Sequence, residues 1–199
     1  MARPREFDEQ AVLDAAVQCF WARGYEATSI RALIEETGIT GASLYNAFGD
    51  KRALYQRALD HYVDGSIADR IRRCAALAPR AAIGMFFADV LDRSLTDSQH
   101  KGCMLVNAAL EAAPEDAVVL KIIAAVLIRI EAFFHECALK GQADGTITRA
   151  LPAEQLAHHL LGALMGLRVL ARVRPERALL EGVVSGALAL LGGDLSPAF

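Results

Sequence analysis

Apolar residues near the start of the chain recur at the spacing of one helix face. Five of them follow positions i, i+3, i+4, i+7 and i+8: Val12, Ala15, Ala16, Cys19 and Phe20. This period predicts an amphipathic helix. Asp8 precedes it as a helix cap, and Gly24 suits the left-handed position that ends a helix.

Two shorter helices are predicted next. Thr28 is expected to cap a segment whose apolar residues share one face, and Gly38 stops that segment after about two and a half turns. Thr40 is expected to cap a third helix, with Leu44 as its main inward residue. Helices this short bury little apolar surface by themselves, so they need a longer partner.

The rest of the chain continues with helical periods and shows no strand-like alternation of useful length. The predicted helices span 50–74, 79–96, 103–113 (closed by Pro114), 115–140, 152–173 and 176–192. A loop rich in Gly and polar residues is expected over 141–151. The fold class is therefore all-α, with about nine helices. A first domain is predicted over 6–66 and a second over 67–199, with the helix that starts at Asp50 joining them.

Composition narrows the class of protein. The chain is 54% hydrophobic and 23% charged, an apolar surplus that is often found in oligomers. The longest stretches without a charge, 155–167 and 182–193, are shorter than the roughly 20 residues that a membrane span needs. The N-terminus resembles no signal peptide, so we expect a cytoplasmic protein that does not bind a membrane.

Four scattered cysteines predict no disulfide, zinc site or other metal site, and we expect no cofactor.

Residues 28 to 47 form a helix-turn-helix pattern whose third helix carries small polar side chains. Thr40, Ser43, Tyr45 and Asn46 are its hydrogen-bonding residues, and Gly41 and Ala42 permit close approach. Asn can bond adenine in the major groove, and Thr or Ser can bond bases or phosphates. Lys51 starts the next helix, where a cation opposes the helix dipole but suits a phosphate. The net charge of this region does not support DNA binding, because residues 1–60 carry seven Lys and Arg against nine Asp and Glu.

Residues 24 to 51, GYEATSIRALIEETGITGASLYNAFGDK, resemble the signature of the TetR family of bacterial regulators, and the likeness covers residues 7 to about 62. The resemblance implies an all-helical homodimer that reads a palindromic double-stranded DNA operator with its third helix and represses transcription until an effector binds its C-terminal body. By position it implies phosphate contacts from Thr28, Ser29, Tyr45 and Lys51. Groove contacts are implied from Thr40, Ser43 and Asn46.

The chain departs from the family at two positions of the third helix. Many members have Lys where this chain has Gly41, and Gly where it has Ala42, so the operator sequence does not follow. Arg3 and Arg5 supply charge that either contacts DNA from an arm or is simply solvated.

The last two helices, from Ala153 and from Pro175, are apolar over most of their circumference, so they need cover on several sides. In the family such helices pair with their mates in a four-helix bundle, which Gly162, Gly166, Gly182 and Gly186 would let approach closely. The residues expected at the dimer interface are Leu160, Leu164, Leu167, Val183, Val184 and Leu188.

The stretch 100–114 holds the most suggestive effector chemistry. Cys103 begins a helix, where backbone N–H groups stabilise a thiolate, and His100 and Lys101 add positive charge nearby. Asn107 and Glu111 follow on the same face. The stretch resembles a branch of the family in which some members sense electrophiles or oxidants through a cysteine at this place. The hypothesis is that modification of Cys103 releases DNA, and the alternative is that Cys103 is an inert buried residue.

Two other effector models remain open. An unknown apolar or aromatic small molecule would lie among the large side chains of the body: Met85, Phe86, Phe87, Met104, Phe133 and Phe134. A metal would need His100 with Cys103, His135 with Cys137, or His158 with His159, none of which has adequate ligand spacing. An enzyme is not expected, since the sequence has no nucleophile with its base and no phosphate loop. The alternative function is a helical small-molecule-binding or scaffold protein without DNA binding.

Overall fold

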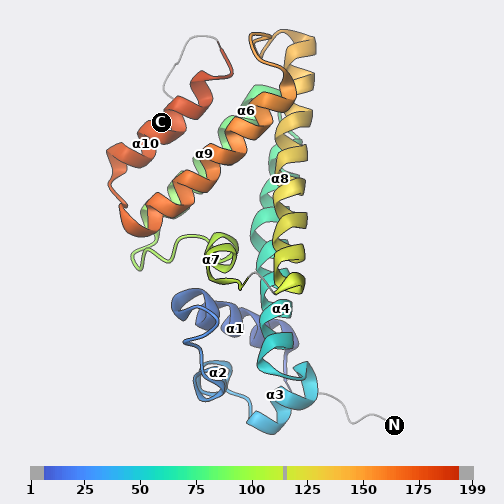
Figure 1. Ribbon diagram of the computed structural model, residues 1–199, viewed down its shortest axis with the longest axis vertical. Helices are drawn as coiled ribbons and strands as arrows, with labels where there is room; N and C mark the ends of the chain where they lie inside the picture. The colour runs from blue at the N-terminus through green and yellow to red at the C-terminus, as the bar shows by residue number, and fades with distance from the viewer. Residues whose placement is uncertain (1–6, 114–115, 193–199) are drawn as a thin grey trace.

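The computed structural model describes residues 7–113 and 116–192, and within these ranges it contains helices and no strand. A three-helix unit lies at one end of an elongated molecule: α1 (Glu9–Arg23), α2 (Ile30–Thr37) and α3 (Gly41–Phe48) (Figure 1). The larger body contains α6 (Pro79–Thr96), α7 (Met104–Glu111), α8 (Ala117–Asp144), α9 (Ala153–Val173) and α10 (Arg177–Ala189). The all-α prediction is confirmed.

A single rod joins the two parts. It consists of α4 (Lys51–Tyr62), the π-helical segment η1 (Val63–Ala68) and α5 (Asp69–Ala75). With this rod counted as one helix, the described residues form nine helices, as predicted. The predicted boundary at residue 66 lies inside η1, so both halves share the rod, and the division into two domains stays a prediction.

Local capping explains where the N-terminal helices begin. The side chain of Asp8 accepts from the N–H of Gln10 at 2.9 Å, and Thr40 accepts from the N–H of Ser43 at 3.1 Å. Both caps were predicted. The expected cap at Thr28 is wrong, because Ser29 caps α2 and accepts from the N–H of Ala32 at 3.1 Å.

Thr28 instead has a fully buried side chain, with no exposed surface. Its hydroxyl donates to the carbonyl oxygen of Gly24 at 2.6 Å. Gly24 has a φ of +77°, and a Cβ there would lie 2.6 Å from a carboxylate oxygen of Glu111. The turn between α1 and α2 is therefore fixed by a buried hydroxyl and by a glycine that lets α7 approach.

The long helix α8 runs four residues past its predicted end at residue 140. A Cβ at Gly141 would lie 2.5 Å from the side chain of Ile147, so this glycine serves close packing. Gly145, with a φ of +81°, ends the helix in the left-handed conformation. The expected loop is therefore shorter than predicted. Pro114, expected to close α7, lies outside the described residues, as do Arg3 and Arg5.

Four phenylalanine rings from α6 and α8 form the centre of the body. Phe86 and Phe134 meet edge to face with their ring centroids 5.1 Å apart, and Phe87 stacks on Phe134 at 5.7 Å. Phe133 completes the cluster. Burying each such ring stabilises the fold by about 2 to 3 kcal/mol. Met85, predicted with this group, is 48% exposed on the outer side of α6.

Helix α9 is, among the described residues, the one helix that is long and apolar enough to cross a membrane by length and composition. Core helices of soluble proteins can meet the same criterion. Here α9 packs against α6, α8 and α10, and its inward face is part of the core.

Candidate DNA-binding surface and effector cavity

The third helix has one buried side and one exposed polar side. Leu44 and Phe48 are 0% and 4% exposed and hold α3 to the rest of the unit. On the opposite side, Ala42, Tyr45 and Asn46 are exposed, with Tyr45 at 48%. These side chains are accessible to a binding partner as large as double-stranded DNA.

The first turn of α3 is ordered by its own hydroxyl groups. Thr40 donates from Oγ1 to Oγ of Ser43 at 3.0 Å while it caps the helix. A Cβ at Gly41 would lie 3.1 Å from Cδ1 of Ile34. The glycine that replaces the family's common lysine thus lets α2 and α3 pack closely.

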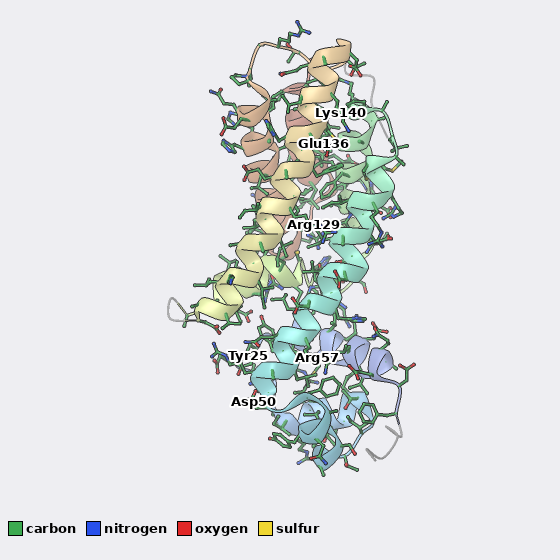
Figure 2. The ribbon with its side chains drawn as sticks, turned by 90° about the vertical axis from the view of Figure 1, so that its right-hand side faces the viewer. Tyr25, Asp50, Arg57, Arg129, Glu136 and Lys140 are labelled. Carbon is green, nitrogen blue, oxygen red and sulfur yellow. The ribbon has the colours of Figure 1, made fainter. Side chains whose placement is uncertain are left out.

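The residues expected to contact phosphate do not all reach the surface. Ser29 is exposed, while the buried hydroxyl of Thr28 bonds the turn, so the predicted phosphate contact by the Thr28 side chain is wrong. Lys51 donates from Nζ to the carbonyl of Glu26 at 3.4 Å and lies 4.3 Å from the ring centre of Tyr25. Tyr25 and Asp50 mark this end of the molecule in Figure 2.

Neighbouring guanidinium groups are paired with carboxylates. Arg31 bonds Glu35 at 2.8 Å, Arg52 bonds Asp116 at 2.5 Å, and Arg57 pairs with Glu9. Lys51, by contrast, contacts a carbonyl oxygen and an aromatic ring. Its ammonium charge is therefore the cation near α3 that is best placed for a phosphate.

A cavity of about 260 Å³ lies where the three-helix unit meets the body. Its lining comes from α1, the α4–η1–α5 rod and helices α6 to α9. Six lining residues matter to its chemistry: Trp21, Tyr62, Phe86, Arg93, Cys103 and Arg168. Since both halves of the chain contribute walls, a molecule bound there would contact both.

Cys103 is 7% exposed and is the N-cap residue of α7, as predicted. The hydroxyl of Tyr62 donates to its Sγ at 3.4 Å. Burial, followed by the nearby Cys103, raises the pKa of Tyr62 well above its ordinary value, so the phenol stays protonated and serves as a donor. No signal in the sequence points to this contact, because Tyr62 and Cys103 lie 41 positions apart in the chain.

The polar neighbours expected around Cys103 have other partners. Lys101 donates from Nζ to Gln18 at 3.0 Å and lies 4.7 Å from the ring centre of Trp21. Asn107 donates to the carbonyl of Lys101 at 2.8 Å, and Glu111 accepts from the N–H of Tyr25 at 3.2 Å. The predicted polar stripe thus holds the loop before α7 and the turn after α1.

Of the residues expected to bind or sense the effector, Cys103 and Phe86 line the cavity. Four others are buried outside its lining: Met104, Asn107, Phe87 and Phe133. Their side chains pack in the core, and their role as effector contacts stays a prediction. Aromatic and Met residues at helical spacing face a core or a pocket equally well in a sequence.

The other three cysteines lie away from the cavity lining. Burial raises the pKa of the Cys19 and Cys74 thiols, and it raises that of Cys137 to about 11. Each is therefore protonated and poorly nucleophilic near neutral pH. Of the four cysteines, all within the described ranges, Cys103 alone lines the cavity.

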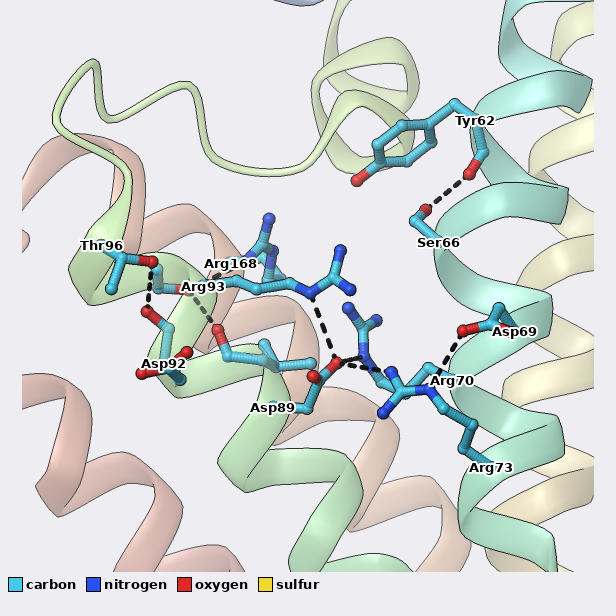
Figure 3. Close-up of polar contacts among 12 residues, drawn as sticks. Tyr62, Ser66, Asp69, Arg70, Arg73, Asp89, Asp92, Arg93, Thr96 and Arg168 are labelled. Carbon is cyan, nitrogen blue, oxygen red and sulfur yellow. Dashed lines mark hydrogen bonds and ion pairs between the residues drawn. The ribbon is translucent and has the colours of Figure 1, made fainter.

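A cluster of guanidinium groups surrounds Asp89 beside the cavity. Arg70 pairs with Asp89, while Arg73 and Arg93 lie 3.4 Å and 3.5 Å from the same carboxylate oxygen (Figure 3). Burial alone would raise the pKa of Asp89, but the bond from Arg70 and the surrounding positive charges hold it below its ordinary value. Sequence reasoning missed this cluster, because no local pattern links residues on α5 and α6.

Arg168 approaches the same region from α9. It donates to Oγ of Ser94 at 2.8 Å and to the carbonyl oxygen of Gly102. Both acceptors are neutral. Arg168 therefore supplies the positive charge next to Cys103 that Lys101 was expected to supply.

The predicted dimer residues are mostly inside the protomer. Leu160, Leu164, Leu167 and Val184 are at most 4% exposed and cannot face a partner, so their prediction is wrong. Val183 and Leu188 are half-buried. A Cβ would meet nothing within 4 Å at any of four glycines on the outer side of these helices: Gly162, Gly166, Gly182 and Gly186.

The histidine and cysteine pairs considered for a metal remain scattered. Among residues 7–113 and 116–192, no group of three or more His, Cys, Asp or Glu side chains could hold a metal ion.

Two family models match the chain. The model described as bacterial regulatory proteins, tetR family, matches residues 12–58, and the tetracyclin repressor-like C-terminal domain matches residues 79–186. The first contains the α2–α3 unit, and the second contains most of the body.

Known proteins of similar sequence are regulators. The chain is 28% identical to the HTH-type transcriptional repressor ComR of Escherichia coli K12, covering 85% of this chain and 82% of ComR. It is also 28% identical to the uncharacterized HTH-type transcriptional regulator YezE of Bacillus subtilis 168, covering 96% and 100%.

Among solved structures, a cysteine mutant of the TetR family regulator CifR, complexed with 26-bp double-strand operator DNA, is 35% identical. The match has a TM-score of 0.83 and covers 94% of this chain and 98% of CifR. With both family models matched in chain order, the protein belongs to the TetR family of bacterial regulatory proteins, a class of transcriptional regulators and not of enzymes.

Proposed function

We propose that this protein is a transcriptional repressor that binds a palindromic double-stranded DNA operator as a homodimer. The observation that carries the proposal is the exposed polar side of α3, with Tyr45 and Asn46 opposite the buried Leu44. Asn46 has the side chain that bonds adenine in the major groove, and Ala42 suits a thymine methyl group. The 35% identity to CifR, solved on its operator, supports the same use of this surface.

Phosphate contacts would position α3 without reading the sequence. We assign them to Ser29 at the start of α2, to the Tyr45 hydroxyl and to Lys51. Thr40 and Ser43 bond each other, so each would contact DNA through the donor or acceptor positions of its hydroxyl that this bond leaves unused. Most cations near α3 are paired with carboxylates. The affinity for the operator would therefore depend on two copies of α3 that read two half-sites about 34 Å apart.

The dimer would form through the outer faces of α9 and α10. Gly162, Gly166, Gly182 and Gly186 leave these faces without side-chain bulk, so a second copy can approach closely. Val173, 65% exposed at the end of α9, would be covered there. A DNA-bound regulator of this kind resides in the cytoplasm, where we place this protein.

A gel shift with DNA from upstream of the protein's own gene tests the proposal. We expect a salt-sensitive, sequence-preferring complex with the effector-free dimer. Asn46→Ala should weaken it, while Arg129→Gln, on the outer surface of α8 (Figure 2), should not. Absence of any such complex would favour the alternative, a helical small-molecule-binding or scaffold protein without DNA binding.

We further propose that occupation of the cavity, or modification of Cys103, releases the operator. The Tyr62 hydroxyl donates to Sγ of Cys103, and the cavity gives a reagent access to that sulfur. With N-ethylmaleimide, the sulfur adds to one carbon of the double bond and a proton ends on the other. The adduct would fill a space whose walls come from both halves, which displaces the three-helix unit relative to the body.

Release by N-ethylmaleimide separates a sensing cysteine from an inert one. Wild-type protein should leave the operator, and Cys103→Ser should stay bound. Cys137→Ser should behave as wild type, because that thiol lies outside the cavity lining and burial raises its pKa to about 11. If Cys103→Ser leaves the operator as readily as wild type, the cysteine proposal is wrong.

A further inference from the structure

The cavity that we propose as the effector site has walls of two kinds. Phe86, Leu105 and Ile130 supply apolar surface, whereas Arg70, Arg93 and Arg168 bring guanidinium groups from three different helices. A volume of about 260 Å³ lies just below the usual range for drug-sized ligands, which starts at about 300 Å³. The space therefore suits a small molecule, such as one with a single ring or a short chain.

Positive charge exceeds negative charge on this lining. Asp89, beside the lining, is the shared carboxylate partner of Arg70, Arg73 and Arg93. Arg73 also bonds Asp69, which in turn bonds Arg72. Arg168 contacts the neutral acceptors Ser94 and Gly102. A guanidinium that is partly removed from water without a counter-charge favours an incoming anion.

The two carboxylates on the lining do not supply the missing counter-charge. Asp14 is exposed and bonds His61 at 2.7 Å at the side of the cavity formed by α1 and α4. Asp97 accepts from the backbone N–H groups of Gln99 and Lys101 at 3.1 Å and 2.7 Å. Both are thus engaged by other groups.

An unpaired donor lies on the same lining. Nε1 of Trp21 is buried, and it has no hydrogen-bond partner among the described residues. An indole N–H and a guanidinium can only donate hydrogen bonds. The guanidinium groups on this lining therefore call for a ligand that accepts hydrogen bonds.

We infer that the effector is a small organic carboxylate with an apolar body. A carboxylate accepts only, carries the charge that Arg168 lacks, and matches a planar guanidinium with two parallel bonds. Its apolar part would lie against Phe86 and Leu105. This inference names the ligand class for the proposed effector site and rests on that proposal.

Trp21 provides a direct readout, because it is the only tryptophan in the chain and it lines the cavity. Its fluorescence is titrated in the full-length protein with phenylacetate and hexanoate, and with their neutral isosteres phenylacetamide and hexanamide. We expect each carboxylate to bind at least about tenfold more tightly than its amide, as a charge-assisted hydrogen bond predicts.

Three variants locate the charge that is responsible. Arg168→Gln should abolish the preference for carboxylate, Arg168→Lys should retain part of it through the remaining charge, and Arg129→Gln should leave it unchanged. If Arg168→Gln is poorly folded by circular dichroism, Arg93→Gln tests the second cation of the lining. The inference is overturned by equal binding of acids and amides, or by no response to either acid up to about 10 mM. It is also overturned by a preference that survives in folded Arg168→Gln, or in Arg93→Gln where Arg168→Gln does not fold.

A gel shift on the same samples keeps the two proposals apart. An operator complex without carboxylate binding refutes the ligand class and leaves the DNA-binding function intact. Carboxylate binding without an operator complex refutes the proposed function. Carboxylate binding that also dissociates the complex supports both.

Discussion

The hydroxyl of Tyr62 donates a hydrogen bond to Sγ of Cys103 at 3.4 Å, which links the end of α4 to the start of α7. A donor of this kind stabilises a thiolate more than a thiol. Tyr62→Phe should therefore slow the alkylation of Cys103 by iodoacetamide about tenfold at pH 7, as expected for a lost bond to a charged acceptor. Mass spectrometry of the time course measures the rate, and Cys103→Ser identifies the background from other thiols. An unchanged rate in Tyr62→Phe would show that the phenol does not assist the sulfur.

Asn46 should carry part of the base recognition. Asn46→Ala should reduce operator affinity by about 1 to 3 kcal/mol and relax the preference at one base pair of each half-site. Fluorescence anisotropy with matched and substituted operators measures both effects. Lys51→Gln is the comparison, since loss of a phosphate contact should weaken all sequences alike and reduce the salt dependence. A uniform loss in Asn46→Ala would mean that this residue only positions the helix.

The buried hydroxyl of Thr28 should matter for stability and not for direct DNA contact. Thr28→Val removes the bond to the Gly24 carbonyl and should lower the free energy of unfolding by about 1 to 2 kcal/mol. Urea denaturation measures this loss. Salt dependence of operator binding should stay as in wild type, because no phosphate contact disappears. A reduced salt slope in folded Thr28→Val would restore Thr28 as a phosphate contact.

Asp89 should stabilise the body in a pH-dependent way. Asp89→Asn leaves the nearly buried Arg70 without its carboxylate and should cost about 3 kcal/mol at pH 7. The pKa of Asp89 is lowered in the folded protein, so its stabilisation is complete above the unfolded value of about 4 and is lost as the pH falls through the folded value. Thermal melting curves should therefore show a difference in Tm between variant and wild type that disappears at acid pH. A difference that stays constant from pH 7 to below pH 3 would contradict this account.

A larger side chain in place of a glycine on the outer face of α9 should prevent dimerisation without unfolding the protomer. A Cβ at Gly166 meets nothing within 4 Å in the protomer, so Gly166→Glu should fold but place like charges at the two-fold interface. Light scattering should report a monomer. Gly84→Glu is the matched control, because that α6 position is equally open and should leave a dimer. Dimers of equal affinity in both variants would move the interface away from α9.

Elements governed by local chemistry could be predicted from the sequence. The caps at Asp8 and Thr40 are single side-chain bonds to the next turn, so their residue type and spacing are sufficient. Thr28 and Ser29 are both good caps and adjacent, and only the tertiary position of the turn decides which hydroxyl faces solvent. The phosphate contact expected of the Thr28 side chain came from the family resemblance, and the buried hydroxyl argues against it.

The cavity could not be predicted in the same way. Trp21, Tyr62 and Arg168 lie far apart in the chain and meet only when α1, α4 and α9 are packed. On α9, apolar residues cover most of the circumference, so Leu160 and Leu164 were expected to face a partner. Gly162 and Gly166 mark the outer face, yet a glycine in a sequence shows only that bulk is absent, not on which side of the helix it lies.

The cavity takes its walls from both halves of the molecule, so under the proposed release mechanism ligand binding in the cavity and operator binding would be thermodynamically linked. The coupling free energy is the same in either direction. A ligand that weakens operator affinity about a hundredfold must itself bind about a hundredfold more weakly to the protein on DNA. The concentration of ligand at which transcription begins is therefore set by the operator as well as by the cavity, and a tighter operator makes the same protein a less sensitive detector.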